Sequence, residues 1–145
     1  MIDPRSHFTW ELVVGREAID ERGHVNNIVY VRWLQDVAQK HSEALGWDAA
    51  AYERLGSLFV VRRHQVDYLR PVLEGQRLAL TTTVTGWRGA SAIRHTTIVR
   101  LDDGHEVARG ETQWVLVAMP EGRPRRIPEQ LREAFGAAPL AASAS

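Results

Sequence analysis

The chain has 145 residues, a length that fits a single domain, and its apolar and charged fractions of 44% and 25% are those of an ordinary globular protein. Its 18 basic and 18 acidic residues cancel, so the overall charge gives no attraction to nucleic acid or to an anionic membrane. Cysteine is absent, which excludes disulfides, thiolate nucleophiles and zinc–thiolate sites.

The first part of the chain predicts one strand and one long helix. Residues 1–10 contain neither an apolar run nor a small-residue cleavage site, so no signal peptide is expected. No stretch approaches the ~18 apolar residues of a membrane span, and we predict a cytoplasmic location. Apolar residues alternate over residues 8–14, which predicts a strand. After a polar stretch, apolar residues recur at i, i+3, i+4 and i+7 over residues 30–45, which predicts an amphipathic helix.

The sequence also predicts where this helix begins and ends and which of its faces is buried. Asn26 or Asn27 is a suitable N-cap, and Gly46 is a suitable C-terminal stop. Tyr30 and Trp33 lie on the apolar face, so we expect that face to be buried against a sheet.

The remainder of the chain is rich in strands. A second, shorter helix is expected over 47–55, and a short helix with Pro128 at its start is expected over 129–135. Residues 86–89 and the sequence Asp102-Asp103-Gly104 are typical of turns. Four segments between the two helices have the β-branched and aromatic composition of strands: 58–69, 78–85, 92–101 and 107–119.

This order of elements predicts an α+β fold, with one long helix against a five-stranded antiparallel sheet. Residues 1–135 are expected to form one domain, and the low-complexity residues 136–145 are expected to form a frayed tail. One helix cannot cover both faces and both edges of such a sheet, so self-association into a homodimer is expected.

The segment that carries chemistry is 18–30, at the entrance to the long helix. A helix N-terminus offers unpaired backbone N–H groups and a partial positive charge, which suit a carbonyl oxygen that becomes negative during attack. Asp20, a few residues upstream, is placed to activate a water molecule or to attack directly. These parts are sufficient for transfer of an acyl group to water.

The spacing Asp20-x-x-Gly23-His24-Val25-Asn26-Asn27-x-x-Tyr30 resembles the signature of hotdog-fold acyl-CoA thioesterases, the 4-hydroxybenzoyl-CoA thioesterase and YbgC-like family. The same pattern resembles the plant acyl-ACP thioesterases. Residues 59–71 resemble the second block of the YbgC-like enzymes, and residues 123–129 resemble their usual ending. The resemblance runs from about residue 8 to residue 131 and covers nearly the whole chain.

The resemblance implies a hotdog fold, in which a curved sheet wraps the helix, with active sites at the interface of a homodimer that often pairs further into a homotetramer. It implies that Asp20 is the catalytic carboxylate and that the backbone N–H of Asn27 polarises the thioester carbonyl. Two positions depart from the pattern, because many relatives carry an acidic residue at the position of Ala18 and often a Glu at that of Asp36.

Other residues of the segment are candidates for the site. Gly23 permits either a close approach of substrate or a positive φ, and Asn26 is a candidate for substrate binding as well as for capping. His24 is a candidate for the catalytic set, where it would hydrogen-bond substrate or orient Asp20 or a water, or it would only tie the loop together. Arginines suited to a coenzyme A phosphate are Arg62, Arg63 and Arg70.

We therefore predict a thioesterase that hydrolyses an acyl-CoA, or an acyl-ACP, to the free acid, with Asp20 as general base or nucleophile and with no cofactor or metal. One alternative is a hotdog dehydratase acting on a hydroxyacyl thioester, with His24 and a carboxylate such as Asp36. Against this alternative, the chain lacks the proline-glycine segment that is expected after the histidine of such a dehydratase. The other alternative is a non-catalytic acyl-CoA binding protein. The acyl group itself is not readable from the sequence.

Overall fold

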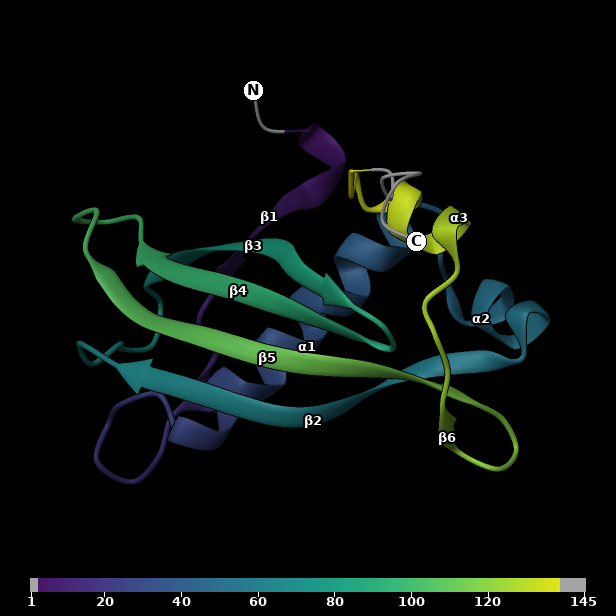
Figure 1. Ribbon diagram of the computed structural model, residues 1–145. Helices are drawn as coiled ribbons and strands as arrows, with labels where there is room; N and C mark the ends of the chain where they lie inside the picture. Colours follow the sequence, from purple (N-terminus) through teal and green to yellow (C-terminus); the bar gives the residue numbers. More distant parts are fainter. Residues whose placement is uncertain (1–2, 139–145) are drawn as a thin grey trace.

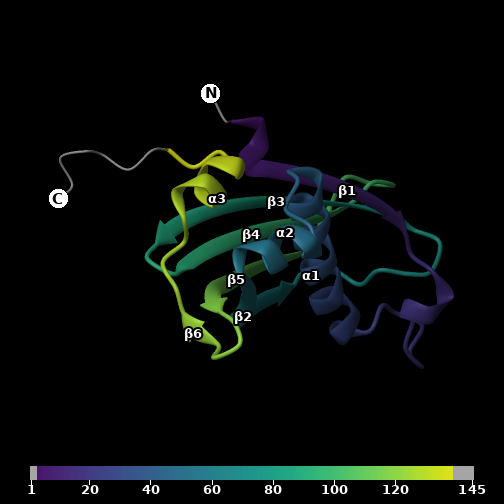
Figure 2. The same ribbon diagram turned by 90° about the vertical axis from the view of Figure 1, so that its right-hand side faces the viewer.

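A computed structural model describes residues 3–138 of the chain. Figure 1 shows a long helix lying behind a curved antiparallel sheet, and Figure 2 shows that helix seated against one face of the sheet. This is the predicted α+β arrangement. The strands are β1 (His7–Val13), β2 (Ser57–Tyr68), β3 (Arg77–Arg88), β4 (Ser91–Arg100), β5 (Glu106–Ala118) and β6 (Arg123–Pro124).

The helices occupy the predicted segments. The long helix is α1 (Asn27–Ala44), and the shorter ones are α2 (Ala49–Leu55) and α3 (Glu129–Ala134). Two short 3-10 helices, η1 (Pro4–Ser6) and η2 (Arg16–Ala18), flank β1. Among the described residues, no helix is both long and apolar enough to cross a membrane. Of the predicted frayed tail, residues 136–138 are described, and the remaining seven lie outside the described residues.

The order of the strands across the sheet is β1-β3-β4-β5-β2, so β1 and β2 form its two edges. Within the described residues the sheet has six strands, because β6 pairs with the end of β5. The predicted count of five is therefore one short. A two-residue strand that contains a proline has no alternating pattern from which it could be predicted.

The predicted turn over residues 86–89 is also wrong in part. Strand β3 continues to Arg88, with a shift of register after Thr85, and the chain reverses at Gly89 and Ala90. Gly86 has φ 57°, so this glycine marks an irregularity inside the strand and not its end.

Helix α1 has the predicted caps. Asn26 is the N-cap, and its side-chain Oδ1 accepts the backbone N–H of Ile28 at 3.0 Å. After Leu45, Gly46 adopts φ 88° and its N–H donates to the carbonyl of Glu43, which ends the helix. The buried face includes Tyr30, Trp33, Leu34, Val37, Ala38 and His41.

A glycine on β5 makes room for a buried leucine of α1. A Cβ built on Gly110 would come within 2.6 Å of Cδ1 of Leu34, which is 2% exposed. The absence of a side chain at Gly110 therefore lets Leu34 pack directly on β5.

Candidate active site

The loop that enters α1 is a compact turn held by its own backbone. Ile19 and Val25 form an antiparallel bridge, and the N–H of Asp20 donates to the carbonyl of His24 at 2.8 Å. The N–H of Gly23 donates to the carbonyl of Asp20 at 3.0 Å. Gly23 has φ 84°, and a Cβ added there would meet nothing within 4 Å. The turn therefore requires glycine for its positive φ and not for its small size.

The carboxylate of Asp20 is fixed through one of its two oxygens. Oδ1 accepts the N–H of Arg22 at 2.9 Å and that of His24 at 3.3 Å. No hydrogen bond to Oδ2 is found among residues 3–138. The half-buried carboxylate is therefore oriented by its own loop, and its second oxygen remains available to a ligand.

The first turn of α1 presents one unpaired backbone donor. The N–H of Ile28 is bonded to the Asn26 side chain, and the N–H of Val29 donates to the Asn26 carbonyl at 2.9 Å. Within the described part of the chain, the N–H of Asn27 donates to no protein acceptor. It lies at the positive end of an 18-residue helix, where a partly negative oxygen is stabilised.

Asp20 and Asn27 line the same pocket, which has a volume of about 380 Å³. Tyr68, the last residue of β2, lines one side of it, and its hydroxyl donates to the carbonyl of Asn27 at 3.1 Å. Burial raises the pKa of Tyr30, which also lines the pocket, to about 12, so its hydroxyl stays protonated at neutral pH. The full lining is Asp20, Arg22, His24, Val25, Asn26, Asn27, Tyr30, Tyr68, Leu69, Arg70 and Pro71.

Five of the predicted site residues therefore meet in one place: Asp20, His24, Asn26, Asn27 and Arg70. The side chain of His24 is exposed, while its backbone N–H and carbonyl hold Asp20, so the histidine ties the loop together through its main chain. Arg22 and Tyr68 also line the pocket and were not predicted. Arg22 lies inside the motif at a position with no fixed residue type, so only the folded loop brings it to the pocket.

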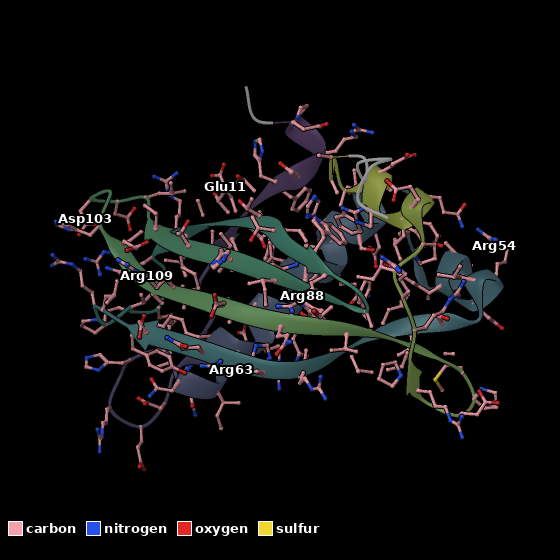
Figure 3. All side chains as sticks on the ribbon, viewed as in Figure 1. Glu11, Arg54, Arg63, Arg88, Asp103 and Arg109 are labelled. Carbon is pink, nitrogen blue, oxygen red and sulfur yellow. The ribbon has the colours of Figure 1, made fainter. Side chains whose placement is uncertain are left out.

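Gly23, Arg62 and Arg63 do not line this pocket. The two arginines lie in the middle of β2, where the register with β5 shifts between Val61 and Arg63. The shift breaks the strict alternation that would send neighbouring side chains to opposite faces, and both arginines are exposed. Figure 3 shows Arg63 along the length of β2. A role for these two in phosphate binding stays a prediction.

The pair proposed for a dehydratase is not brought together within one chain. His24 lines the pocket, but Asp36 does not. Asp36 lies nine residues beyond Asn27 on α1, or about 13 Å along the axis at 1.5 Å per residue. Among residues 3–138, no group of three or more acidic or histidine side chains is arranged to hold a metal ion.

Comparison with known sequences gives one family. The model of the Thioesterase-like superfamily matches residues 14–135. A chloroplastic acyl-acyl carrier protein thioesterase of Arabidopsis thaliana is 25% identical over 128 residues, which are 87% of this chain and 66% of that protein. The chain thus spans slightly less than two thirds of the length of the curated relatives that it matches.

Solved structures share the fold. A 1,4-dihydroxy-2-naphthoyl-CoA thioesterase from Synechocystis superimposes with a TM-score of 0.83 at 19% identity, covering 90% of this chain and 96% of that one. A thioesterase from Thermus thermophilus, solved with coenzyme A and Zn, is 27% identical with a TM-score of 0.73, covering 88% and 90% of the two chains. The hotdog fold predicted from the sequence is thereby confirmed.

Proposed function

The chain belongs to the thioesterase-like superfamily, and from this premise we propose that it hydrolyses an acyl thioester of coenzyme A or of an acyl carrier protein to the free acid and the thiol. The observation that carries the proposal is the shared pocket of Asp20 and Asn27, in which a carboxylate oxygen and a backbone N–H both lack protein partners among the described residues.

The two groups have complementary tasks in such a reaction. The thioester carbonyl accepts the N–H of Asn27 at the positive end of α1, which stabilises the negative charge that develops on its oxygen during attack. Asp20 then takes a proton from the attacking water, or attacks the carbonyl carbon itself to give a mixed anhydride that water cleaves. In both routes the thiolate of the carrier leaves. In the general-base route the acyl carbon gains its new oxygen from water, and in the anhydride route it gains it from Asp20 or from water, according to which anhydride carbon the water attacks.

The edge strand β2, whose last residue lines the pocket, supports a homodimer. Among residues 3–138, the backbone groups on its outer side have no partner strand. Leu58 and Val60 on β2 are 38% and 39% exposed, and Ile28 at the start of α1 is 70% exposed. Pairing of two β2 edges would cover this apolar surface and bring a second chain beside the pocket.

The test is hydrolysis by Asp20→Asn, measured as thiol release from a panel of short, long and aromatic acyl-CoA thioesters. The amide keeps the acceptor oxygen for the loop but can neither take a proton nor attack, so we expect kcat to fall by at least ~100-fold with the fold intact. Glu21→Gln is the matched control, because Glu21 is an exposed neighbour outside the pocket and undergoes the same change of carboxylate to amide.

Near-wild-type turnover by Asp20→Asn would refute the assignment. Incorporation of oxygen-18 into Asp20 during a single turnover in labelled water tests for the anhydride route. Label in the Asp20 carboxylate shows that water attacked an anhydride at the carboxyl carbon of Asp20, whereas label in the product acid alone excludes this attack and leaves attack of water at the acyl carbon.

A further inference from the structure

A second cavity lies between the C-terminal half of α1 and the sheet, and the proposed reaction does not use it. Its volume is about 310 Å³, at the small end of the range for sites that hold small molecules. Most of its wall is apolar and aromatic, from α1, α2 and the connection between them, from four strands and from the residue after α3: Ala38, Trp47, Tyr52, Phe59, Val84, Trp87, Ala92, Trp114 and Phe135.

The buried cationic group in this wall is the guanidinium of Arg94. This residue of β4 is 6% exposed and lines the cavity. Its Nη1 donates to Nδ1 of His41 at 2.9 Å and to the hydroxyl of Thr82 at 3.0 Å, while its Nε is fully enclosed and has no hydrogen-bond partner among residues 3–138. A buried cation is costly inside an apolar wall unless an anion balances its charge.

The charge of Arg94 is not balanced by its neighbours. Nε2 of His41 lies 2.8 Å from the carbonyl oxygen of Arg5 and must donate to it, so Nδ1 is the unprotonated nitrogen that accepts from Arg94. Burial and the nearby guanidinium lower the pKa of His41 to about 4, so the imidazole is neutral. Among residues 3–138, no carboxylate forms an ion pair with Arg94.

Two carboxylates stand at the cavity's exposed rim, and both already have partners. Asp48 is the N-cap of α2, where its Oδ1 accepts the N–H of Ala51 at 2.9 Å. Glu43 accepts the side-chain amide of Gln39 at 3.0 Å. Nε1 of Trp114 also has no partner among residues 3–138, but it is fully enclosed, so it is not open to the cavity. The cavity therefore offers one buried cationic side chain, Arg94, that no acidic side chain balances within the described part of the chain.

We propose that this cavity binds a compact apolar molecule that ends in a carboxylate, with the carboxylate at Arg94 and the apolar part against the aromatic wall. A carboxylate supplies the negative charge that the Arg94 guanidinium lacks among residues 3–138, and its oxygens accept charge-assisted hydrogen bonds. An alcohol of the same skeleton supplies one neutral oxygen and leaves the charge of Arg94 unbalanced.

Two sources would present this chemistry. One is a free acid, such as the product of the proposed hydrolysis. The other is the far end of a dicarboxylic acyl group whose thioester lies at Asp20, and this source rests on the proposed function. Arg94 is hydrogen-bonded to His41, which lies 14 residues beyond Asn27, or about 21 Å along the helix axis, so the second source requires a long acyl chain.

The test is equilibrium binding of hexanoate, octanoate and benzoate, each beside the alcohol of the same skeleton. Intrinsic fluorescence reports on the cavity because Trp47, Trp87 and Trp114 all line it, and titration calorimetry gives the affinity directly. At least one of the carboxylates is expected to bind saturably and at least about tenfold more tightly than its alcohol. Arg94→Met should abolish the preference for the acid, and Arg94→Lys, which keeps the charge, should retain it in part.

Arg54→Met is the matched control, because Arg54 is exposed on α2, outside the cavity, as Figure 3 shows. It loses the same charge and should bind like the wild type. Equal affinity for acids and alcohols, absence of saturable binding in the folded wild type, or unchanged binding by Arg94→Met would overturn the proposal. Should circular dichroism show that Arg94→Met is unfolded, the wild-type comparison and Arg94→Lys decide.

The result of the carboxylate-binding test does not depend on whether the protein hydrolyses a thioester. Asp20→Asn should bind the carboxylates as the wild type does, so a failure of hydrolysis and a failure of acid binding are separate results. The source is distinguished by kinetics. A higher kcat/KM for hexadecanedioyl-CoA, whose chain is long enough to reach from Asn27 to Arg94, than for palmitoyl-CoA, with this preference lost in Arg94→Met, assigns the cavity to the substrate's far end. Binding of the free acid without this kinetic preference assigns the cavity to a free acid.

Discussion

The N-cap of α1 allows the stability of the helix and the proposed catalysis to be perturbed separately. Asn26 accepts the N–H of Ile28 through its side chain and directly precedes Asn27, the proposed donor to the thioester carbonyl. Asn26→Ala removes the cap. Asn26→Asp keeps a capping oxygen but adds a negative charge beside the point where the substrate oxygen itself becomes negative.

The two substitutions should differ in what they change. Loss of an N-cap costs about 1 kcal/mol, which lowers the Tm of a domain of this size by about 3 °C. Aspartate caps as well as asparagine, so Asn26→Asp should keep the free energy of unfolding within about 0.5 kcal/mol. A unit charge about 6 Å from the developing oxyanion raises the barrier by about 3 kcal/mol at an effective dielectric constant of about 20, or roughly 100-fold in rate.

Scanning calorimetry measures the stability of each variant, and thiol release gives kcat/KM for the best substrate of the panel. Gln130→Glu, which adds the same charge at an exposed position on α3 outside the pocket, is the control for net charge. A wild-type kcat/KM in Asn26→Asp would refute the idea that negative charge develops at the first turn of α1. An unchanged Tm in Asn26→Ala would refute the capping argument.

Three further predictions concern packing, pH and assembly. Gly110→Ala should lower the free energy of unfolding by about 1–3 kcal/mol in denaturant titrations, because the new methyl group meets the buried Leu34; a neutral result would mean that α1 can retreat at no cost. The pKa of His41 is lowered from 6.5 to about 4, so its contribution to stability is complete above pH 6.5 and should decline by up to about 1.4 kcal/mol per unit as the pH falls toward 4. His41→Gln should flatten that slope, and an equal slope in the variant would contradict the assignment. Val60→Lys on the exposed edge should convert a dimer to monomer in sedimentation velocity, whereas Thr9→Lys, on the opposite edge, should not; the reverse result would place the interface on β1.

Much of the architecture was predictable because it depends on local patterns. The apolar period over residues 30–45 and the capping chemistry of Asn26 and Gly46 give α1 nearly to the residue. The main strands follow from β-branched runs separated by turns. The order of strands was not predictable, because the pairing of β2 with β5 joins residues that are distant in sequence and leaves no local signal.

In the candidate site, too, the parts that depend on local sequence were predictable and the parts that depend on long-range contacts were not. The motif from Asp20 to Asn27 is local, and the fold brings both residues to one pocket. The cavity at Arg94 was missed because arginine in a strand is usually exposed. A signal was nevertheless present, since Ala92, Arg94, Thr96 and Ile98 share one face of β4 and the two apolar members indicate that this face is the inner one. No feature of the sequence indicated that Arg94 would lack an acidic partner among the described residues.

The position of Tyr68 has a consequence for how activity should depend on protein concentration. Its hydroxyl holds the carbonyl of Asn27, yet the residue itself belongs to the strand at the margin of the sheet. A second copy that docks along β2 would also hold the start of α1 in place. Dilution that separates the two copies should therefore make the Asn27 N–H less well ordered before the chain unfolds. Specific activity, measured across a dilution series, would then report on association as faithfully as a sedimentation experiment does.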